Sequence, residues 1–248
     1  MDFGIRDRWA VVGASSQGLG YGCADALAAE GVNLVVNARR AGPLAEAAAR
    51  LRRHGVTVHE VVGDISRPDV RANLLEAAPQ VDILVTNAGG PPPGDFRSWT
   101  EDDWLAALRR NMLTPVELIR ATVDDMASRG FGRVVNITSG AVKAPIATLG
   151  LSNGARSGLT GFVAGVARQP QLAASNVTVN NLLPGRFATA RLRQTGSGED
   201  PSPEGIPAGR FGDPSEFGAT CAFLCSAQAG YVTGQNVLVD GGAYPGTM

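Results

Sequence analysis

The sequence predicts a single α/β domain built on a doubly wound, seven-stranded parallel sheet with helices on both faces. Short runs rich in Val, Ile and Leu alternate along the 248 residues with longer Ala-, Leu- and Arg-rich stretches of helical period. The short runs are apolar throughout, which is typical of parallel strands covered on both faces. Strand–helix repeats of this kind connect by right-handed crossovers. The strands are expected at 9–12, 32–36, 56–62, 81–86, 134–137, 177–183 and 236–239.

The composition is that of an ordinary globular chain. Hydrophobic residues make up 44% and charged residues 18%, and the net charge is −1. This charge argues against bulk attraction to nucleic acid or to an anionic membrane. No apolar run approaches the roughly 20 residues that a membrane-spanning helix needs, and the N-terminal segment has no signal-peptide core. We therefore expect a cytoplasmic protein with neither a nucleic-acid nor a membrane partner.

The cysteines predict neither a disulfide framework nor a metal site. There are three, an odd number, and Cys221 and Cys225 lie four positions apart with no further Cys or His nearby. A metal centre would need more ligands than this pair supplies. We expect three buried, reduced thiols and no bound metal.

The first predicted strand runs directly into a glycine-rich turn, 12–20, that opens a helix. Glycines at such a turn let the backbone approach a pyrophosphate, and the helix N-terminus supplies amide donors. The order strand, turn, helix makes this pattern a dinucleotide-binding candidate. Its predicted cofactor-binding residues are Gly13, Ser15, Ser16, Gly18, Leu19 and Gly20.

The end of the second strand indicates which dinucleotide is bound. The strand ends at Asn37-Ala-Arg39-Arg40, with no acidic residue to hold a ribose 2′-hydroxyl. Arg39 can instead make charge-assisted contacts to a 2′-phosphate. This favours NADP(H) over NAD(H). Arg40 is equally consistent with a solvated arginine at a helix start.

Residues 133–162 resemble the catalytic stretch of the short-chain dehydrogenase/reductase family, in which a Ser at a strand end precedes Tyr-x-x-x-Lys on a helix. Ser139 ends a strand and is followed thirteen positions later by Ser152-Asn-Gly-Ala-Arg156, on a helix expected at 149–173. Ser152 occupies the Tyr position and Arg156 the Lys position. Because they are four residues apart, both project from one face of that helix.

Further matches extend the resemblance over almost the whole chain, residues 1–248, and imply one Rossmann-like NADP-binding domain. In the first turn Ala14 stands at the family's first glycine position, where a methyl group is tolerable only with a negative φ. The other matching motifs follow the third, fourth and sixth strands. The resemblance assigns Asp64 and Ile65 to the adenine region, Asn87, Ala88 and Gly89 to the cleft floor, and Pro184, Gly185 and Thr189 to the nicotinamide carboxamide.

The family's usual proton transfer cannot operate unchanged. In the family a Tyr donates the proton, a Lys lowers the Tyr pKa, a Ser binds the substrate oxygen, and an Asn, here matched by Asn111, supports a water relay. All three tyrosines of the chain lie outside residues 133–162. A serine hydroxyl lacks the acidity of a phenol, and an arginine stays protonated. Gly89-Gly-Pro, Val142-Lys-Ala-Pro145 and Ser-Asn-x-x-Arg together resemble a divergent subgroup related to 3-oxoacyl-carrier-protein reductases.

Two hypotheses of function follow. The first is an atypical NADP-dependent carbonyl reductase or alcohol dehydrogenase acting on a small molecule, with Ser139, Ser152, Arg156, Asn111 and Lys143 as catalytic residues. Lys143 is the only lysine. If it were partly desolvated near Arg156, its pKa would fall and it could donate the proton; alternatively it is a solvated loop residue. The second hypothesis is a non-redox nucleotide-binding or partner protein on the same fold.

Residues 190–212 are rich in Gly, Pro and polar residues. A long loop in a compact fold is usually functional, so we expect a substrate lid. The family resemblance also implies a homotetramer or homodimer, formed through helices at about 100–128 and 149–173 and through the C-terminal strand.

Overall fold

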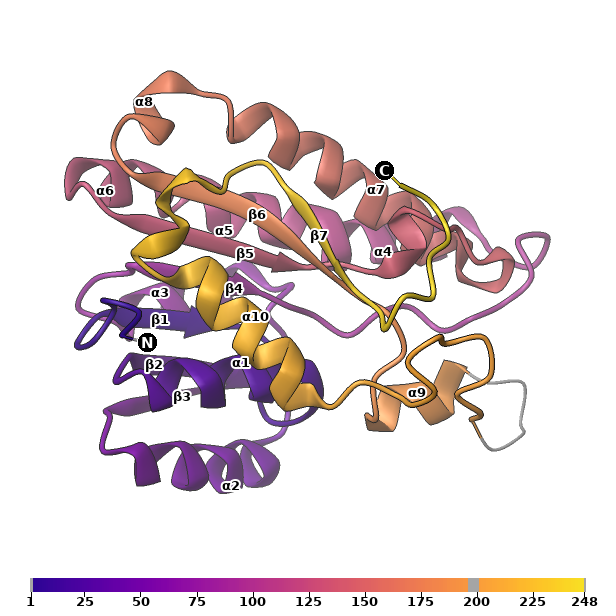
Figure 1. The fold of residues 1–248 in the computed structure, drawn as a ribbon, viewed down its shortest axis with the longest axis horizontal. Coiled ribbons are helices and arrows are strands. Elements are labelled where there is room, and N and C mark those ends of the chain that lie inside the picture. The colour runs from indigo at the N-terminus through magenta and orange to yellow at the C-terminus, as the bar shows by residue number, and fades with distance from the viewer. Residues whose placement is uncertain (1, 196–200, 248) are drawn as a thin grey trace.

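The computed structural model describes residues 2–195 and 201–247 and confirms the predicted fold class (Figure 1). All seven strands pair in parallel, in the order β3-β2-β1-β4-β5-β6-β7. No strand end differs from its predicted position by more than two residues. The strands are β1 (Trp9–Val12), β2 (Asn33–Ala38), β3 (Val58–Val62), β4 (Ile83–Thr86), β5 (Gly132–Ile137), β6 (Val177–Pro184) and β7 (Asn236–Val239).

Helices cover both faces because successive strand residues point to opposite sides of the sheet. In β2, Leu34 and Val36 belong to one apolar core and Val35 to the other. The first core is closed by α1 (Gly18–Ala29), α2 (Ala41–Leu51) and α10 (Pro214–Cys225). The second is closed mainly by α3 (Pro68–Glu76), α5 (Thr114–Arg120), α6 (Val123–Ser128) and α7 (Gly150–Val166), with α4 (Glu101–Leu108) beside α7.

The single helix expected at 149–173 is wrong in one respect: it is two helices. The first, α7, ends at Val166, and a short second helix, α8 (Pro170–Ala173), follows it. Pro170 lacks an amide hydrogen, and its ring disfavours the helical conformation in the residue before it. The break therefore falls just before the proline, and the part that carries Ser152 and Arg156 is continuous.

The closest helix pair is α1 against α10, which cross in front of the sheet (Figure 1). A Cβ atom added to Gly218 would lie 2.1 Å from the carbonyl oxygen of Gly22, so the two backbones touch. The three cysteines, Cys23, Cys221 and Cys225, are buried in this layer as free thiols, as predicted.

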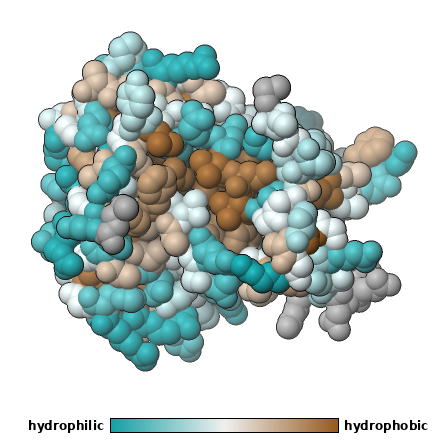
Figure 2. Space-filling model, viewed as in Figure 1, coloured by the Kyte–Doolittle hydropathy of each residue, from teal (hydrophilic) through white to brown (hydrophobic). Residues whose placement is uncertain are grey.

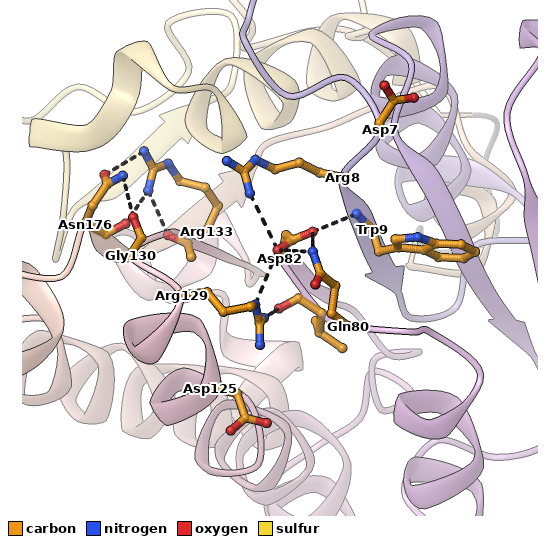
Figure 3. Close-up of polar contacts among 12 residues, drawn as sticks. Asp7, Arg8, Trp9, Gln80, Asp82, Asp125, Arg129, Gly130, Arg133 and Asn176 are labelled. Atoms are coloured by element: carbon orange, nitrogen blue, oxygen red, sulfur yellow. Dashed lines mark hydrogen bonds and ion pairs between the residues drawn. The ribbon is translucent and has the colours of Figure 1, made fainter.

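Polar contacts of charged residues connect the amino ends of the central strands to one another (Figure 3). Asp82, immediately before β4, is only 1% exposed. Its Oδ2 accepts hydrogen bonds from the backbone N–H of Trp9 and the side chain of Gln80, both at 3.0 Å. Arg8 and Arg129 approach Oδ1 at 3.6 and 3.8 Å. One carboxylate thus joins the starts of β1 and β4 and the turn that leads into β5.

A buried arginine continues this edge of the sheet (Figure 3). The Arg133 side chain is completely buried, and burial lowers its pKa to about 10. Its guanidinium donates to the carbonyl oxygens of Ser226, Gly132 and Asn176 and to the Asn176 side chain, at 2.7–3.0 Å. All three of its nitrogens therefore have acceptors, which is how a buried cation is tolerated.

We predict that Asp82→Ala lowers the free energy of unfolding by about 3 kcal/mol, because it leaves the Trp9 N–H and two partly buried arginines without their shared acceptor. Urea unfolding followed by circular dichroism measures the change. Asp69→Ala, which breaks the exposed pair with Arg67, is the control and should leave the midpoint almost unmoved. Equal effects of the two substitutions would contradict a structural role for Asp82.

Candidate active site

A cleft of about 1210 Å³ lies along the carboxyl edge of the sheet. Asp82 and its partners lie at the opposite, amino edge. In doubly wound sheets the ligand crevice opens where neighbouring strands have crossovers leaving in opposite directions, here between β1 and β4. Residues that end or follow the strands form its wall, among them Ala14, Arg39, Gly63, Asn87, Ser139, Gly185 and Asp240.

Half of the predicted residues in the first turn face this cleft. Ser16, Gly18 and Leu19 line it, whereas Gly13, Ser15 and Gly20 lie beneath its surface. The Ser15 backbone N–H donates to the Asn37 carbonyl oxygen at 2.9 Å, and its hydroxyl accepts from the Asn37 N–H at 3.1 Å. Ser15 therefore ties the turn to β2.

Gly13 and Gly20 are required by close contact between two turns. A Cβ atom on Gly13 would lie 2.6 Å from the Asn87 carbonyl oxygen, and one on Gly20 would lie 2.4 Å from the Ala14 carbonyl oxygen. The Asn87 side chain donates to the same Ala14 oxygen at 3.4 Å. The turn after β1 and the turn after β4 thus pack together and form the floor of the cleft. The two glycines are needed for this packing, and not only for the approach of a phosphate.

The condition of a negative φ at Ala14 is not met, because its φ is +46°. The residue adopts a left-handed conformation, at a cost of roughly 1 kcal/mol for an L-residue. The floor contacts explain why, since its carbonyl oxygen is held between Gly20 and the Asn87 side chain.

The end of the cleft near β2 and β3 combines cations with one carboxylate. Arg39 and Arg40 both line the cleft, so the structure places Arg40 in the wall as well. Asp64 and Ile65 lie across from them in the same wall. Burial raises the pKa of Asp64, but hydrogen bonds from Ser66 outweigh it, and Arg110 and Arg39 add to them, so the pKa lies below its ordinary value. The carboxylate therefore stays ionised beside exposed arginines.

Farther along the cleft, Ser139, Ser152 and Arg156 all line its wall. Arg156 is 8% exposed; its Nε donates to Ser152 Oγ at 3.2 Å and its Nη1 to the Ile137 carbonyl oxygen at 2.7 Å. Burial, and secondly the charge of Arg191, lowers the Arg156 pKa to about 10. The Ser139 hydroxyl oxygen accepts the Ala141 N–H at 3.1 Å.

The other two predicted catalytic residues lie outside this wall. Asn111 is buried in a π-helical turn, Arg109–Leu113, a form frequent at functional sites. Its Oδ1 has no hydrogen-bond partner among the described residues, and it lines a separate cavity of about 110 Å³. Lys143 has its ammonium 5.7 Å from the centre of the Tyr244 ring and is not among the residues that line the cleft.

Several residues of the cleft wall were not predicted from the sequence, among them Thr138, Arg191 and Tyr244. The hydroxyl of Thr138 is buried without a partner in the described chain. Arg191, on α9 (Ala190–Thr195), was detectable because it lies two positions after the Thr189 motif. Tyr244 carried no such signal, since it reaches the wall only because the Asp240 carboxylate accepts the N–H groups of Gly242 and Tyr244 and turns the tail back.

Within the described ranges no three or more His, Cys, Asp or Glu side chains are grouped so that they could hold a metal ion. No helix in those ranges has the length and apolar character needed to cross a membrane.

The fold and the cleft define a dinucleotide-binding α/β protein, and comparisons with known proteins identify its family. Residues 13–244 match the family model described as Enoyl-(Acyl carrier protein) reductase. Dehydrogenase/reductase SDR family member 4 of Bos taurus is 35% identical over 249 residues, covering 96% of this chain and 88% of that protein. The chain belongs to the short-chain dehydrogenase/reductase family, whose members are NAD(P)-dependent oxidoreductases.

Solved structures agree along nearly the full length. L-Sorbose reductase from Gluconobacter frateurii, complexed with NADPH and L-sorbose, superposes with a TM-score of 0.90 at 29% identity, covering 99% of this chain and 100% of that one. YwfH, an NADPH-dependent reductase involved in bacilysin biosynthesis, gives 0.89 at 29% identity, with 97% and 99% covered.

We predict that Ala14→Gly raises the free energy of unfolding by roughly 0.5–1 kcal/mol, because relief of the positive φ outweighs the greater flexibility of glycine in the unfolded chain. Chemical unfolding measures the change. Ala45→Gly, on the exposed side of α2, is the matched control and should destabilise by about 1 kcal/mol. A loss of stability in both variants would show that Ala14 is unstrained.

Proposed function

We propose that the protein is an NADP-dependent carbonyl reductase or alcohol dehydrogenase of a divergent subgroup, in which Ser152 and Arg156 replace the family's Tyr and Lys. The observation that carries this proposal is the hydrogen bond from Arg156 Nε to Ser152 Oγ in the wall that also holds Ser139. A buried cation thus holds one hydroxyl in the wall of the cleft that a second serine also lines.

The described residues fit a dinucleotide with a 2′-phosphate. Ser16, Gly18 and Leu19 line the cleft at the amino end of α1, where amide groups favour a pyrophosphate. Arg39 and Arg40 supply two cations where a 2′-phosphate would lie. The unpartnered hydroxyl of Thr138 offers a further donor. NADPH named with the sorbose reductase and with YwfH supports NADP(H) over NAD(H).

The nicotinamide end would be held by the turns after β4 and β6. The floor residues Asn87, Ala88 and Gly89 and the residues Pro184, Gly185 and Thr189 all line the cleft. When bound, the cofactor supplies the hydride for reduction and accepts it in the reverse direction.

We assign the two serines the role of hydrogen-bond donors to the substrate oxygen. Each hydroxyl oxygen already accepts one N–H, from Ala141 at Ser139 and from Arg156 at Ser152. Each hydroxyl hydrogen is therefore directed elsewhere, and a substrate carbonyl oxygen in the cleft can accept both. Fixed donors at an oxygen that becomes negative stabilise the transition state, and removing one typically costs 10²–10³ in rate. The charge of Arg156 behind Ser152 adds to this stabilisation.

The proton that completes the alcohol needs a separate source, since serine is a weak acid. Lys143, a water relay near Asn111, and the substrate's own hydroxyl are the candidates. The Lys143 ammonium lies 5.7 Å from the centre of the Tyr244 ring, and Tyr244 lines the cleft. Lys143 would therefore have to donate its proton to a substrate bound next to Tyr244. The unpartnered Asn111 Oδ1 beside its small cavity supports the water relay.

We further propose a cytoplasmic homotetramer or homodimer with a lid at 190–212. Val237, Leu238 and Val239 of β7 are only partly buried, and Figure 2 shows apolar side chains gathered in a hollow on this face. A symmetric partner would cover such a patch. Ala190, Arg191 and Leu192 line the cleft, which supports a lid; positions 196–200 of the lid lie outside the described residues.

The function is tested by following NADPH absorbance at 340 nm with a panel of activated ketones, and NADPH binding by calorimetry. Turnover with NADPH, and weaker activity with NADH, is the expected result. Tight NADPH binding without turnover of any ketone would favour the non-redox nucleotide-binding protein instead. Absence of binding would favour an interaction role.

We predict that Ser152→Ala lowers kcat/KM about 100-fold with NADPH affinity nearly unchanged, because the variant loses one donor to the developing alkoxide. Steady-state kinetics with one good ketone measures it. Ser157→Ala, an exposed serine further along α7, is the control. A variant that retains native kcat/KM would remove Ser152 from the mechanism.

The same assay separates the proton sources. If Lys143 donates the proton, Lys143→Ala lowers turnover at least tenfold. An unchanged rate assigns the proton to the water relay or to the substrate.

A further inference from the structure

Among the described residues, one side chain of the cleft wall is suited to release a proton near neutral pH. The titratable residues that line the cleft there are six arginines, two aspartates and Tyr244. An arginine keeps its proton. Asp64 stays ionised because its pKa is lowered, and both carboxylate oxygens of Asp240 accept backbone N–H groups. A phenol, by contrast, carries its proton at neutral pH and is a stronger acid than the serine and threonine hydroxyls of the wall.

Contacts of the C-terminal tail place Tyr244 beside the turn that follows β6. A Cβ atom on Gly185 would lie 2.5 Å from Asp240 Cβ, so these two residues pack directly against each other. Asp240 Oδ2 in turn accepts the Tyr244 N–H at 2.8 Å. Gly185 is one of the residues proposed above to hold the nicotinamide end. The tyrosine therefore lies in the part of the cleft where a substrate carbonyl would be reduced.

The turn that begins at Ser139 packs against the segment that leads into this tail. A Cβ atom on Gly140 would lie 3.5 Å from Leu238 Cδ1, and both residues line the cleft together with Tyr244. Lys143 is half-buried at the end of the same turn, with its ammonium 5.7 Å from the centre of the Tyr244 ring. The serine and the tyrosine thus belong to neighbouring segments of one wall.

Lys143 places a positive charge beside the phenol ring. When a phenol gives up its proton, a nearby cation stabilises the negative charge that forms on its oxygen. Lys143 is the only lysine of the chain and is not among the residues that line the cleft. Its charge can therefore reach a bound substrate through the tyrosine. The tail leaves room for the Tyr244 hydroxyl at Gly246, where a Cβ atom would overlap with it.

We infer that Tyr244 donates a hydrogen bond, and then a proton, to the substrate carbonyl oxygen, and that Lys143 is a positioning residue that acts through it. This inference rests on the proposed reductase function and adds a fourth candidate to the proton sources considered there. The pair supplies, from other segments of the chain, the phenol and ammonium that α7 lacks at positions 152 and 156.

The proton transfer balances with the proposed reduction. As the carbonyl is reduced to an alcohol and NADPH is oxidised to NADP⁺, the carbonyl oxygen takes up one proton. The Tyr244 O–H bond breaks while the alcohol O–H bond forms, and the phenolate regains its proton from water. In the reverse direction the phenolate accepts the proton of the alcohol.

Tyr244→Phe keeps the ring and removes only the hydroxyl. With one good ketone, kcat should fall about 100-fold, which is a usual contribution of a general acid. NADPH affinity, measured by calorimetry, should stay within about twofold of native, which shows that the fold is intact. Tyr231→Phe, which changes an exposed tyrosine outside the cleft wall, is the matched control and should keep the native kcat. A Tyr244→Phe variant with native kcat would overturn the inference.

A double-mutant comparison tests whether Lys143 acts through Tyr244. Lys143→Met should lower kcat about tenfold, and Lys143→Arg should restore most of it because the charge is kept. In the Tyr244→Phe background, Lys143→Met should change kcat less than about twofold, since residues that act as a unit are not additive. A further tenfold loss in that background would assign the proton to Lys143 itself and reject the pair.

A spectroscopic measurement separates this inference from the proposed function. In protein labelled with [ζ-¹³C]tyrosine, the NMR signal that disappears in Tyr244→Phe belongs to Tyr244. Addition of 2,2,2-trifluoroacetophenone to the complex with NADP⁺, in which no reduction can occur, should shift this signal and leave those of Tyr21 and Tyr231 in place. A shift without turnover of any ketone would retain the phenol as the donor to the carbonyl and reject the reductase. Turnover without a shift would reject the role of Tyr244 and retain the reductase, and the absence of both would reject both.

Discussion

The contact between the turns after β1 and β4 is the constraint on which the cleft depends. Gly13 and Gly20 carry no side chain because the Asn87 and Ala14 carbonyl oxygens occupy that space. The parallel pairing of β1 and β4 brings these turns to the same edge of the sheet, and their backbone contact closes the floor there. The strain at Ala14 is a consequence: its carbonyl must stay in this contact, so the residue accepts a φ of +46°. Neighbouring strands then place the remaining wall residues relative to this floor.

Much of this architecture was predictable because it depends on local patterns. Continuous apolar runs located all seven strands, and strand ends are where a doubly wound sheet holds ligands. The helical spacing of Ser152 and Arg156 correctly placed them on one face, where they hydrogen-bond. The break before Pro170 could also have been predicted, since proline disfavours a helical residue before it.

Other features depend on contacts between distant segments and left no local signal. Ser15 looks like a phosphate-binding residue in its motif, yet its partner is Asn37, at the other side of the sheet's first crossover. Tyr244 reaches the cleft only through the turn that Asp240 holds in the tail. Lys143 was considered because it is close in sequence to Ser139, but its ammonium lies near the Tyr244 ring of that tail and Lys143 does not line the cleft. Side-chain direction in irregular segments is a tertiary property, which the spacing of residues does not encode.

The two buried arginines show how structure separates a stabilising charge from a functional one. Burial lowers the pKa of both Arg133 and Arg156 to about 10. At the amino edge, every nitrogen of Arg133 donates to an oxygen of the fold. At the carboxyl edge, two nitrogens of Arg156 donate to oxygens of the fold. The third lies toward the cleft, near a second arginine. A cation that needed only to hold the fold together would be satisfied as Arg133 is. The third nitrogen of Arg156 is thus available to donate to a molecule in the cleft, as no nitrogen of Arg133 is.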